Sequence, residues 1–578
     1  MPAMPVHNAD IARVFGQIAD LLEIEGANPF RVRAYRNAAR ELEMLGVPAA
    51  GMLARGEDLR ELPGIGDDLA AKIAEIVATG SCKALEKLRR ELPPTITQLL
   101  EIPHLGPRRV RALHERLGVQ TLEQLAEAAR GGRIRALAGF GPKTEEAILE
   151  ALAQHAAAPA RLERVIAAQY AEPLRAVLAE VPGVREAVIA GSFRRARETV
   201  GDIDILVSAG AAAPVMDRFV HYEEVGEVLA AGDTRATVVL KCGLQVDLRV
   251  VAPESHGAAL LYFTGAKAHN IALRRIAQSR GLKLSEYGLF RGARRTAGAT
   301  EASVYRALGL PWIAPELRED RGEIEAARAG KLPRLVERAD LRGDLHVHTR
   351  ASDGHDTLRA MAEAARAAGL EYIAITEHSR RLTVAHGLDP ERLRRQMAEI
   401  DALNAELEGI TLLKGIEVDI LEDGRLDLPD EVLADCDLVV GAVHSAFDLP
   451  RAKQTRRILR ALENPRLSIL AHPTNRVIGT RAACDVDILR VVRQARERGC
   501  FLELNAQPGR LDLLDTHCRL AREEGVLVAI GSDAHGVRDY ANLDWGIGQA
   551  RRGWLGAADV LNTRTLAQLR RLLAKGRR

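Results

Sequence analysis

Apolar residues recur at helical spacing near the start of the chain, for example at Ile11, Phe15 and Ile18, which predicts helices over residues 1 to about 90. Between residues 156 and 253, strand-like runs alternate with helical runs. From Leu341 onward, apolar strand-like runs again alternate with helical runs, which is typical of a β/α barrel. We therefore predict a multidomain protein of α+β and α/β class, with helical N-terminal domains and a C-terminal β/α barrel. The length of 578 residues agrees, because single cores rarely grow beyond about 300 residues.

Two carboxylates follow a Gly-Ser turn in the central part of the chain. Gly191-Ser192 is followed after a short spacer by Asp202 and Asp204, and residues at i and i+2 of a strand lie on the same face. Asp247 occupies the matching face of a second strand-like run. Three carboxylates suit two divalent cations about 4 Å apart, the arrangement used in phosphoryl transfer. We predict a nucleotidyltransferase site with Mg²⁺ or Mn²⁺ at these aspartates; the alternative is an Asx-rich turn before an ordinary strand.

Three short segments in the N-terminal part resemble one another, and each is followed by a helical run: residues 62–66, 102–106 and 137–141. Such a turn presents backbone N–H groups of a helix N-terminus to a phosphate oxygen without reading the bases. One turn alone would more often be structural, but three together favour helix-hairpin-helix motifs that bind the DNA backbone. We expect Gly66 and Gly106 to need a positive φ, so that valine would not be tolerated there. The predicted DNA-binding residues are Gly64, Gly66, Gly106, Arg108, Arg109, Gly139, Gly141 and Lys143.

Strand-like runs of the C-terminal third end in histidine or carboxylate residues. Strand ends converge on the active site of a β/α barrel, so these side chains should meet. A single histidine would more often be a surface or core residue, but six at strand ends are not explained that way; His355, His386 and His517 follow no such run and are left out. Imidazoles and carboxylates without thiolate suit two or three Zn²⁺ or Mn²⁺ ions in a hydrolytic site. The predicted ligands are His346, His348, Asp353, His378, Glu417, His444, His472, Asp533 and His535.

Composition adds little to this picture. The net charge of +2 neither supports nor excludes nucleic acid binding. No apolar run approaches the ~18 residues of a membrane span, and no signal-peptide pattern opens the chain. The six cysteines form no Cys-x-x-Cys pair, which is typical of a reducing compartment. We therefore expect a cytoplasmic protein.

Residues 1 to about 316 resemble the family X DNA polymerases, the group that includes the vertebrate repair polymerase beta. The resemblance rests on residues 191–204, on Asp247, on residues 262–265 (Tyr-Phe-Thr-Gly) and on residues 284–289, which are similar to the family's thumb signature. It implies a set of nucleotide-binding residues: Ser192 and Arg195 at the triphosphate, Tyr262 and Phe263 under the sugar, Gly265 in the neighbouring Thr-Gly turn, Asn270 at the base edge and Arg274 on the template side.

A lyase role is implied more weakly by the same resemblance. Lys72 occupies the position of the family's Schiff-base lysine, and a lysine amine is suited to attack a ribose aldehyde. Asp68, however, stands where repair members carry a phosphate-binding lysine, and Arg31 replaces another. A carboxylate would repel a 5′-phosphate, so a solvated helix-face lysine is the alternative for Lys72.

The ligand pattern of the C-terminal third is similar to the polymerase-and-histidinol-phosphatase (PHP) domain, a metal-dependent phosphoesterase. Glu377 stands where that family often has aspartate, and we expect it not to bind a metal. The whole chain resembles the bacterial and archaeal PolX family, in which the two parts are fused in this order. The implied domains are 1–90 lyase-like, 91–155 fingers, 156–253 palm, 254–316 thumb, 317–341 linker and 342–578 PHP.

The resemblance implies a repair polymerase that extends a primer 3′-OH with dNTP substrates on gapped or nicked duplex DNA. It further implies 3′–5′ exonuclease activity in the barrel, with abasic-site endonuclease or 3′-phosphatase activity as further possibilities, and a monomeric protein. Alternatives are a barrel that is a small-molecule phosphatase, or a DNA-end-binding phosphoesterase or scaffold with a weak or inactive polymerase.

Overall fold

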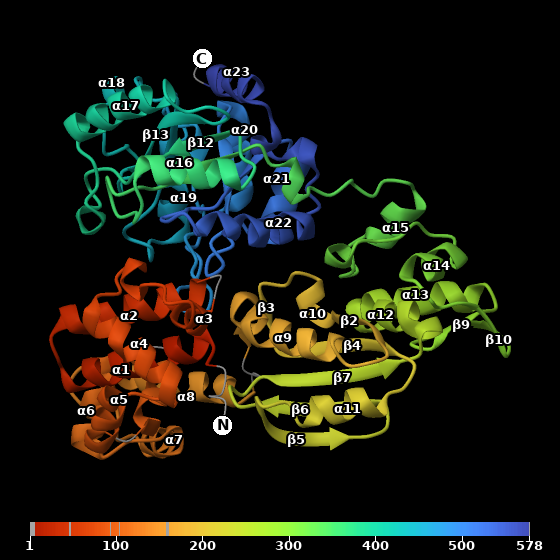
Figure 1. Cartoon of the computed structure of the whole chain (residues 1–578). Helices are drawn as coiled ribbons and strands as arrows, with labels where there is room; N and C mark the ends of the chain where they lie inside the picture. Colours follow the sequence, from red (N-terminus) through yellow and green to blue (C-terminus); the bar gives the residue numbers. More distant parts are fainter. Residues whose placement is uncertain (1–5, 46–47, 93, 103–104, 158–160, 577–578) are drawn as a thin grey trace. The chain divides into compact units, whose positions relative to one another are not determined.

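The helices predicted at the N-terminus are present in this computed structural model and continue to residue 157 (Figure 1). The structure describes residues 6–576 except 46–47, 93, 103–104 and 158–160; Pro103 and His104 of the second predicted hairpin therefore lie outside the described residues. Ile11, Phe15 and Ile18 are fully buried, as their spacing predicted. The helices are α1 (Asn8–Glu25), α2 (Pro29–Met44), α3 (Ala49–Ala54), α4 (Asp67–Thr79), α5 (Lys83–Glu91), α6 (Pro107–Leu117), α7 (Leu122–Arg130) and α8 (Pro142–Ala157).

The chain divides into two compact units. The first contains residues 1–177, 218–231 and 236–246, and the second contains residues 178–217, 232–235 and 247–578. All six cysteines are free, and five of them are buried. Within the described part of the chain, no helix has the length and apolar character needed to cross a membrane.

The predicted palm contains a five-stranded sheet with the strand order β2-β4-β7-β6-β5. Strand β4 runs antiparallel to β2, and β5 runs antiparallel to β6. The strands are β2 (Val184–Ile189), β4 (Asp202–Ala209), β5 (Val225–Ala231), β6 (Arg235–Leu240) and β7 (Gln245–Val251). The helices are α9 (Arg164–Ala179), the short α10 (Gly191–Arg194) and α11 (Ala213–Val220), with the two-residue strands β1 (Leu162–Glu163) and β3 (Thr199–Val200).

The predicted thumb and the charged segment after it share one hydrophobic cluster. Leu317, Ile324 and Leu335 are buried in it together with thumb residues such as Val304, and with Trp554 from the barrel. Residues 317–341 are rich in charge, but several of their apolar side chains pack into this cluster. The elements are α12 (His256–Thr264), α13 (Lys267–Ser279), β8 (Lys283–Ser285), β9 (Gly288–Arg291), β10 (Arg294–Ala297), α14 (Glu301–Ala307) and α15 (Glu323–Arg328).

The C-terminal domain is the predicted β/α barrel. Its seven strands are parallel, in the order β11-β12-β13-β14-β15-β16-β17, and a parallel bridge from Val347 to Ala534 nearly closes the ring. The strands are β11 (Gly343–Val347), β12 (Tyr372–Ile375), β13 (Thr411–Asp419), β14 (Leu438–Ala442), β15 (Ile469–Leu470), β16 (Phe501–Asn505) and β17 (Val528–Gly531). The helices are α16 (Leu358–Ala367), α17 (Pro390–Asn404), α18 (Asp430–Leu433), α19 (Arg451–Ala461), α20 (Ile488–Arg498), α21 (Asp515–Glu523), α22 (Leu543–Arg552) and α23 (Leu566–Gly576) (Figure 1).

Candidate active sites

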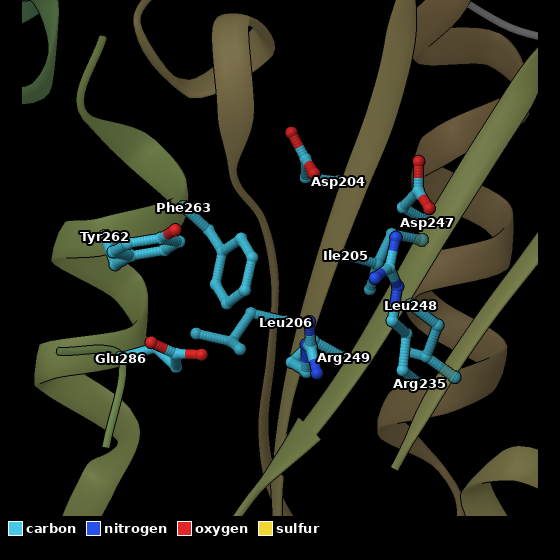
Figure 2. A pocket seen from close by; sticks show the side chains of 10 residues that line it. All are labelled: Asp204, Ile205, Leu206, Arg235, Asp247, Leu248, Arg249, Tyr262, Phe263 and Glu286. Carbon is cyan, nitrogen blue, oxygen red and sulfur yellow. The ribbon is translucent and has the colours of Figure 1, made fainter. Parts of the chain in front are cut away.

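The three palm aspartates lie on two neighbouring strands of the sheet. Asp202 and Asp204 are on β4 and Asp247 is on β7. The alternation predicted for β7 is present, because Val246 and Leu248 are buried whereas Asp247 is half-buried. Figure 2 shows the carboxylates of Asp204 and Asp247 at the same end of one cavity.

Gly191 makes room for one of these carboxylates. Its φ is +60°, and a Cβ placed on it would lie 2.3 Å from Asp204 Oδ2. A side chain is excluded here both by the backbone conformation and by the space that Asp204 occupies. The Gly-Ser turn and the carboxylate are therefore one local arrangement.

The electrostatics of the palm carboxylates favour a bound cation. Burial, and then the negative charges of Asp202 and Asp247, raise the pKa of Asp204 to about 7. A divalent cation would relieve this repulsion, and carboxylate oxygens are the ligands that Mg²⁺ prefers. The donor set thus fits a metal site.

This pKa gives a prediction about stability. A folded pKa near 7, against an ordinary value of 3.8, means that the contribution of Asp204 to folding stability is fully present below about pH 4, declines between about pH 4 and 7, and is lost above pH 7. We expect Asp204→Asn to raise the free energy of unfolding in EDTA at pH 8 by roughly 1–3 kcal/mol, and the gain to shrink at lower pH. Thermal unfolding at several pH values, with the exposed Glu180→Gln as control, checks this. A variant less stable than the wild type at pH 8 contradicts it.

A cavity of about 280 Å³ adjoins the palm carboxylates (Figure 2). The aromatic pair Tyr262 and Phe263 forms part of its wall, with ring centroids 5.1 Å apart. The Arg274 guanidinium lies 5.0 Å from the Tyr262 ring, and that of Arg249 lies 5.4 Å from the Phe263 ring. Of the residues predicted to bind nucleotide, only these two aromatic residues line the cavity. Sequence reasoning did not assign a role to three other lining residues, Arg235, Arg249 and Glu286.

The remaining predicted nucleotide contacts are engaged with the protein itself. Arg195 Nε lies 3.0 Å from Glu319 Oε1, and its Nη1 donates to the Thr264 carbonyl at 2.7 Å. The Asn270 amide nitrogen donates to the carbonyls of Tyr262 and Gly265 at 2.7 and 3.1 Å, while its oxygen has no partner. Ser192 is half-buried in α10. A role for these residues in nucleotide binding stays a prediction.

In the hairpins, the positive φ lies at a different glycine from the one expected. Gly64 and Gly139 have φ of +67° and +85°, whereas Gly66 and Gly106 have φ of −87° and −81° and are the N-caps of α4 and α6. The expectation that Gly66 and Gly106 need positive φ is therefore wrong. A Cβ on either would meet nothing within 4 Å, so the absent side chain leaves the helix N–H groups open to a ligand. The predicted cations Arg108 and Lys143 are exposed and Arg109 is half-buried beside the Phe140 ring.

The prediction for DNA binding changes accordingly. We expect Gly106→Val to weaken binding to every gapped duplex by roughly tenfold, because its side chain would stand where a phosphate approaches, with a stability cost of only about 1 kcal/mol. Arg108→Gln should reduce the slope of log affinity against log salt by about 1. Fluorescence anisotropy on several unrelated sequences at two salt concentrations tests both. A strong preference for one sequence, or binding unchanged by both substitutions, would count against the hairpin interpretation.

The first hairpin differs from the others around Lys72. Its helix α4 begins with Asp67 and Asp68, and Lys72 Nζ pairs with the Asp68 carboxylate. Although burial acts to lower it, the ion pair with Asp68 and the nearby Tyr35 hydroxyl raise the pKa of Lys72 above its ordinary value. A protonated amine does not attack an aldehyde, so this environment disfavours the lyase role.

All nine predicted barrel ligands converge at the C-terminal ends of the strands. Eight of them form three groups whose ligand atoms lie within 4.8 Å of one another, and the ninth, His472, lies beside them with its Nε2 3.1 Å from Glu417 Oε1. His348 and His378 each belong to two groups, so the groups are contiguous. The groups are His348, Asp353, His378 and His535; His346, His348 and Asp533; and His378, Glu417 and His444.

The barrel site is built for cations rather than for internal hydrogen bonds. His346 Nε2, both ring nitrogens of His348 and Glu417 Oε2 are buried and have no hydrogen-bond partner. Burial, and then the neighbouring imidazoles of His535 and His378, lower the pKa of His348 to about 3. A neutral imidazole with a free lone pair is the form that binds a metal. The donor chemistry therefore fits Zn²⁺ or Mn²⁺.

Four family models match parts of the chain. They describe a helix-hairpin-helix domain (residues 6–82), a SAM-like helix-hairpin-helix tandem (96–154), a DNA polymerase beta thumb (259–319) and a PHP domain (344–506). A Bacillus subtilis (strain 168) protein named DNA polymerase/3′-5′ exonuclease PolX is 40% identical over 575 residues, which are 99% of this chain and 100% of that protein. The chain belongs to the PolX family.

Two other relatives match about a third of this PolX chain. A probable phosphatase of Thermoanaerobacter sp. (strain X514) is 31% identical over 232 residues, covering 38% of the chain and 89% of that protein. A probable phosphatase of Acetivibrio thermocellus is 34% identical over 202 residues, covering 33% of the chain and 78% of that protein. The match covers most of each of these proteins, so both are much shorter than this chain.

Sequence reasoning about this PolX chain missed the residues that hold the ligands. Glu503 Oε1 lies 2.6 Å from His346 Nδ1, and Asn505 Nδ2 donates to Asp533 Oδ2 at 2.9 Å. A signal was present, because β16 carries these two polar residues at alternate positions of an apolar strand. Glu377, expected not to bind a metal, is in none of the three groups and accepts hydrogen bonds from Thr349, Ser352 and Gln396.

Proposed function

We propose that this chain is a DNA-directed DNA polymerase of family X that fills gaps in DNA repair, including base excision repair, and that its barrel is a metal-dependent 3′–5′ exonuclease. One observation carries the proposal: a chain that matches a named DNA polymerase/3′-5′ exonuclease over 99% of its length also brings eight side chains that could bind metal together in its barrel, with His472 beside them. The three palm aspartates on adjacent strands support the polymerase half. DNA binding and metal dependence are properties of this family.

The proposed domains follow the sequence boundaries. They are a lyase-like domain at residues 1–90, fingers at 91–155, palm at 156–253, thumb at 254–316, a connection at 317–341 and a PHP domain at 342–578. The hairpins at Gly64–Gly66, Gly106 and Gly139–Gly141 hold the DNA backbone. They make no contacts with base edges, so their binding does not depend on the DNA sequence. The ion pair between Lys72 and Asp68 argues against lyase catalysis by Lys72.

In the palm, the primer 3′-OH attacks the α-phosphate of the dNTP and pyrophosphate leaves. Asp202, Asp204 and Asp247 would hold two Mg²⁺ or Mn²⁺ ions, which when bound stabilise the attacking and leaving oxygens. Asp247 would also favour loss of the hydroxyl proton. Tyr262 and Phe263 would lie under the sugar in the cavity beside the carboxylates.

The other nucleotide contacts complete the site. Ser192 and Arg195 would hold the triphosphate, for which Arg195 has to exchange the Glu319 carboxylate for phosphate oxygens. Asn270 would meet the base edge and Arg274 the template side. Gly265 would allow the close approach of Asn270, since a Cβ there would lie 2.6 Å from Asn270 Oδ1.

In the barrel, the nine side chains would hold two or three Zn²⁺ or Mn²⁺ ions, which when bound supply a nucleophile near neutral pH for hydrolysis of a phosphodiester. The substrate would be a DNA 3′ end. Removal of a 3′-phosphate is a second candidate, favoured by the barrel relatives that are named probable phosphatases. Cleavage at abasic sites is a further activity to test. A cytoplasmic location and a monomeric state stay predictions.

The test uses one gapped duplex with a labelled primer, assayed with dNTPs in Mg²⁺ and then in Mn²⁺. We expect extension that stops at the downstream strand, and shortening of the primer when dNTPs are omitted. A second primer ending in a 3′-phosphate separates phosphatase from exonuclease chemistry. Extension without shortening or dephosphorylation would refute the barrel assignment. Shortening without extension would instead favour a DNA-end-binding phosphoesterase with an inactive polymerase.

A further inference from the structure

We propose that Glu503 is a positioning residue of the barrel, whose carboxylate orients His346 and the loop of His472 so that their side chains face the metal cluster; this rests on the proposed metal-dependent function of the barrel. Glu503 lies on β16, and its side chain is 2% exposed. No ligand group of the barrel includes it. Its role would be exerted through the ligands it touches.

One oxygen of Glu503 fixes the ring of His346. Oε1 lies 2.6 Å from His346 Nδ1, and an ionised carboxylate only accepts hydrogen bonds. The proton of a neutral His346 is therefore held on Nδ1, which leaves the lone pair on Nε2. That nitrogen has no hydrogen-bond partner and lies 3.6 Å from both Glu417 Oε2 and Asp533 Oδ1. The contact thus selects the tautomer and direction that a metal ligand needs.

The other oxygen of Glu503 fixes a second ligand segment. Oε2 accepts the backbone N–H of His472 at 2.8 Å, and the side chain of His472 lies 3.1 Å from Glu417. His346 belongs to β11, whereas His472 follows β15. One buried carboxylate therefore ties together two ligands from separate strands, which a hydrogen bond to a single histidine would not do.

A glycine on the neighbouring strand supports the same interpretation independently. A Cβ on Gly531 of β17 would lie 2.5 Å from Glu503 Oε1 and 3.0 Å from the His346 Cβ. Gly531 does not have a positive φ, so a glycine is needed here for space and not for the backbone conformation. The space that Gly531 leaves is the space in which the carboxylate meets the imidazole.

The experiment measures metal affinity rather than catalysis. The full-length protein carries Asp202→Ala and Asp204→Ala in every sample, so that Mn²⁺ binding reports on the barrel. Isothermal titration with Mn²⁺ compares this background with added Glu503→Gln, which keeps size but gives one acceptor in place of two. Glu524→Gln is the matched control, because Glu524 pairs with Arg493 and Arg496 and touches no barrel ligand. We expect the dissociation constant of at least one Mn²⁺ to rise about 10- to 100-fold for Glu503→Gln and to be unchanged for the control.

A second variant keeps the test decisive if Glu503→Gln does not fold. Gly531→Ala retains every charge but pushes Oε1 from its place, and we expect a weaker Mn²⁺ affinity in a protein of wild-type circular dichroism. Unchanged affinity in whichever of these variants folds overturns the positioning role. The outcome is independent of the proposed nuclease: weakened Mn²⁺ binding supports the role of Glu503 even if the wild type cleaves no DNA, and wild-type cleavage with unchanged affinity refutes only that role.

Discussion

Replacing Asp202 and Asp204 together by alanine should abolish nucleotide incorporation and leave the degradation of DNA 3′ ends intact. Both carboxylates lie on one strand beside Asp247, and the two ions they would hold contribute several kcal/mol to the transition state. We expect a loss of at least about 1,000-fold in the incorporation rate. Primer extension and primer shortening are measured on the same gapped duplex.

The control for this variant is Glu180→Ala, which removes an exposed carboxylate outside the site. It should extend the primer at the wild-type rate. If the double variant extends the primer at a near wild-type rate, the palm assignment is wrong. If it loses shortening as well, the two sites are not independent.

His346→Ala and His444→Ala should each remove 3′–5′ degradation while polymerisation in Mg²⁺ persists. The two histidines belong to different ligand groups of the barrel, and the loss of one imidazole removes an ion or its geometry. We expect degradation to fall by about 1,000-fold or more, the factor that corresponds to several kcal/mol of metal-ion stabilisation. Titration of purified enzyme with Mn²⁺ should show fewer bound ions per chain.

His386→Asn is the matched control for the barrel variants. His386 is exposed, lies in no ligand group and has a φ of +55°, a conformation that asparagine tolerates. It should degrade DNA at the wild-type rate. Metal-dependent degradation that persists in His346→Ala and His444→Ala, in preparations free of contaminating nuclease, would mean that the nuclease lies elsewhere.

The positions of the candidate ligands could be predicted from the sequence because local periodicity determines their faces; that they bind metal stays a prediction. Alternation put Asp202 and Asp204 on one side of a strand, and the apolar runs and their ends marked eight of the barrel candidates, whereas Asp353 follows in a loop. What the ligands contact could not be predicted, because pairing across strands depends on register and on long-range packing. The contacts of Glu503 with His346 and of Glu319 with Arg195 join residues more than 100 positions apart. The positive φ was assigned to the wrong glycine for a related reason. A Gly-x-Gly pattern does not indicate which of its two glycines adopts the left-handed conformation.

The hydrophobic cluster that joins the thumb to Trp554 has a consequence for truncation experiments. A chain cut after residue 319 would lose Ile324, Leu335 and Trp554 from this cluster, and an isolated barrel would present the Trp554 ring to water. Exposed apolar surface of this kind favours self-association. Activities measured on separated halves would then combine the loss of a domain with damage to the half that is kept. Point substitutions in the intact chain are the cleaner way to assign each activity to its domain.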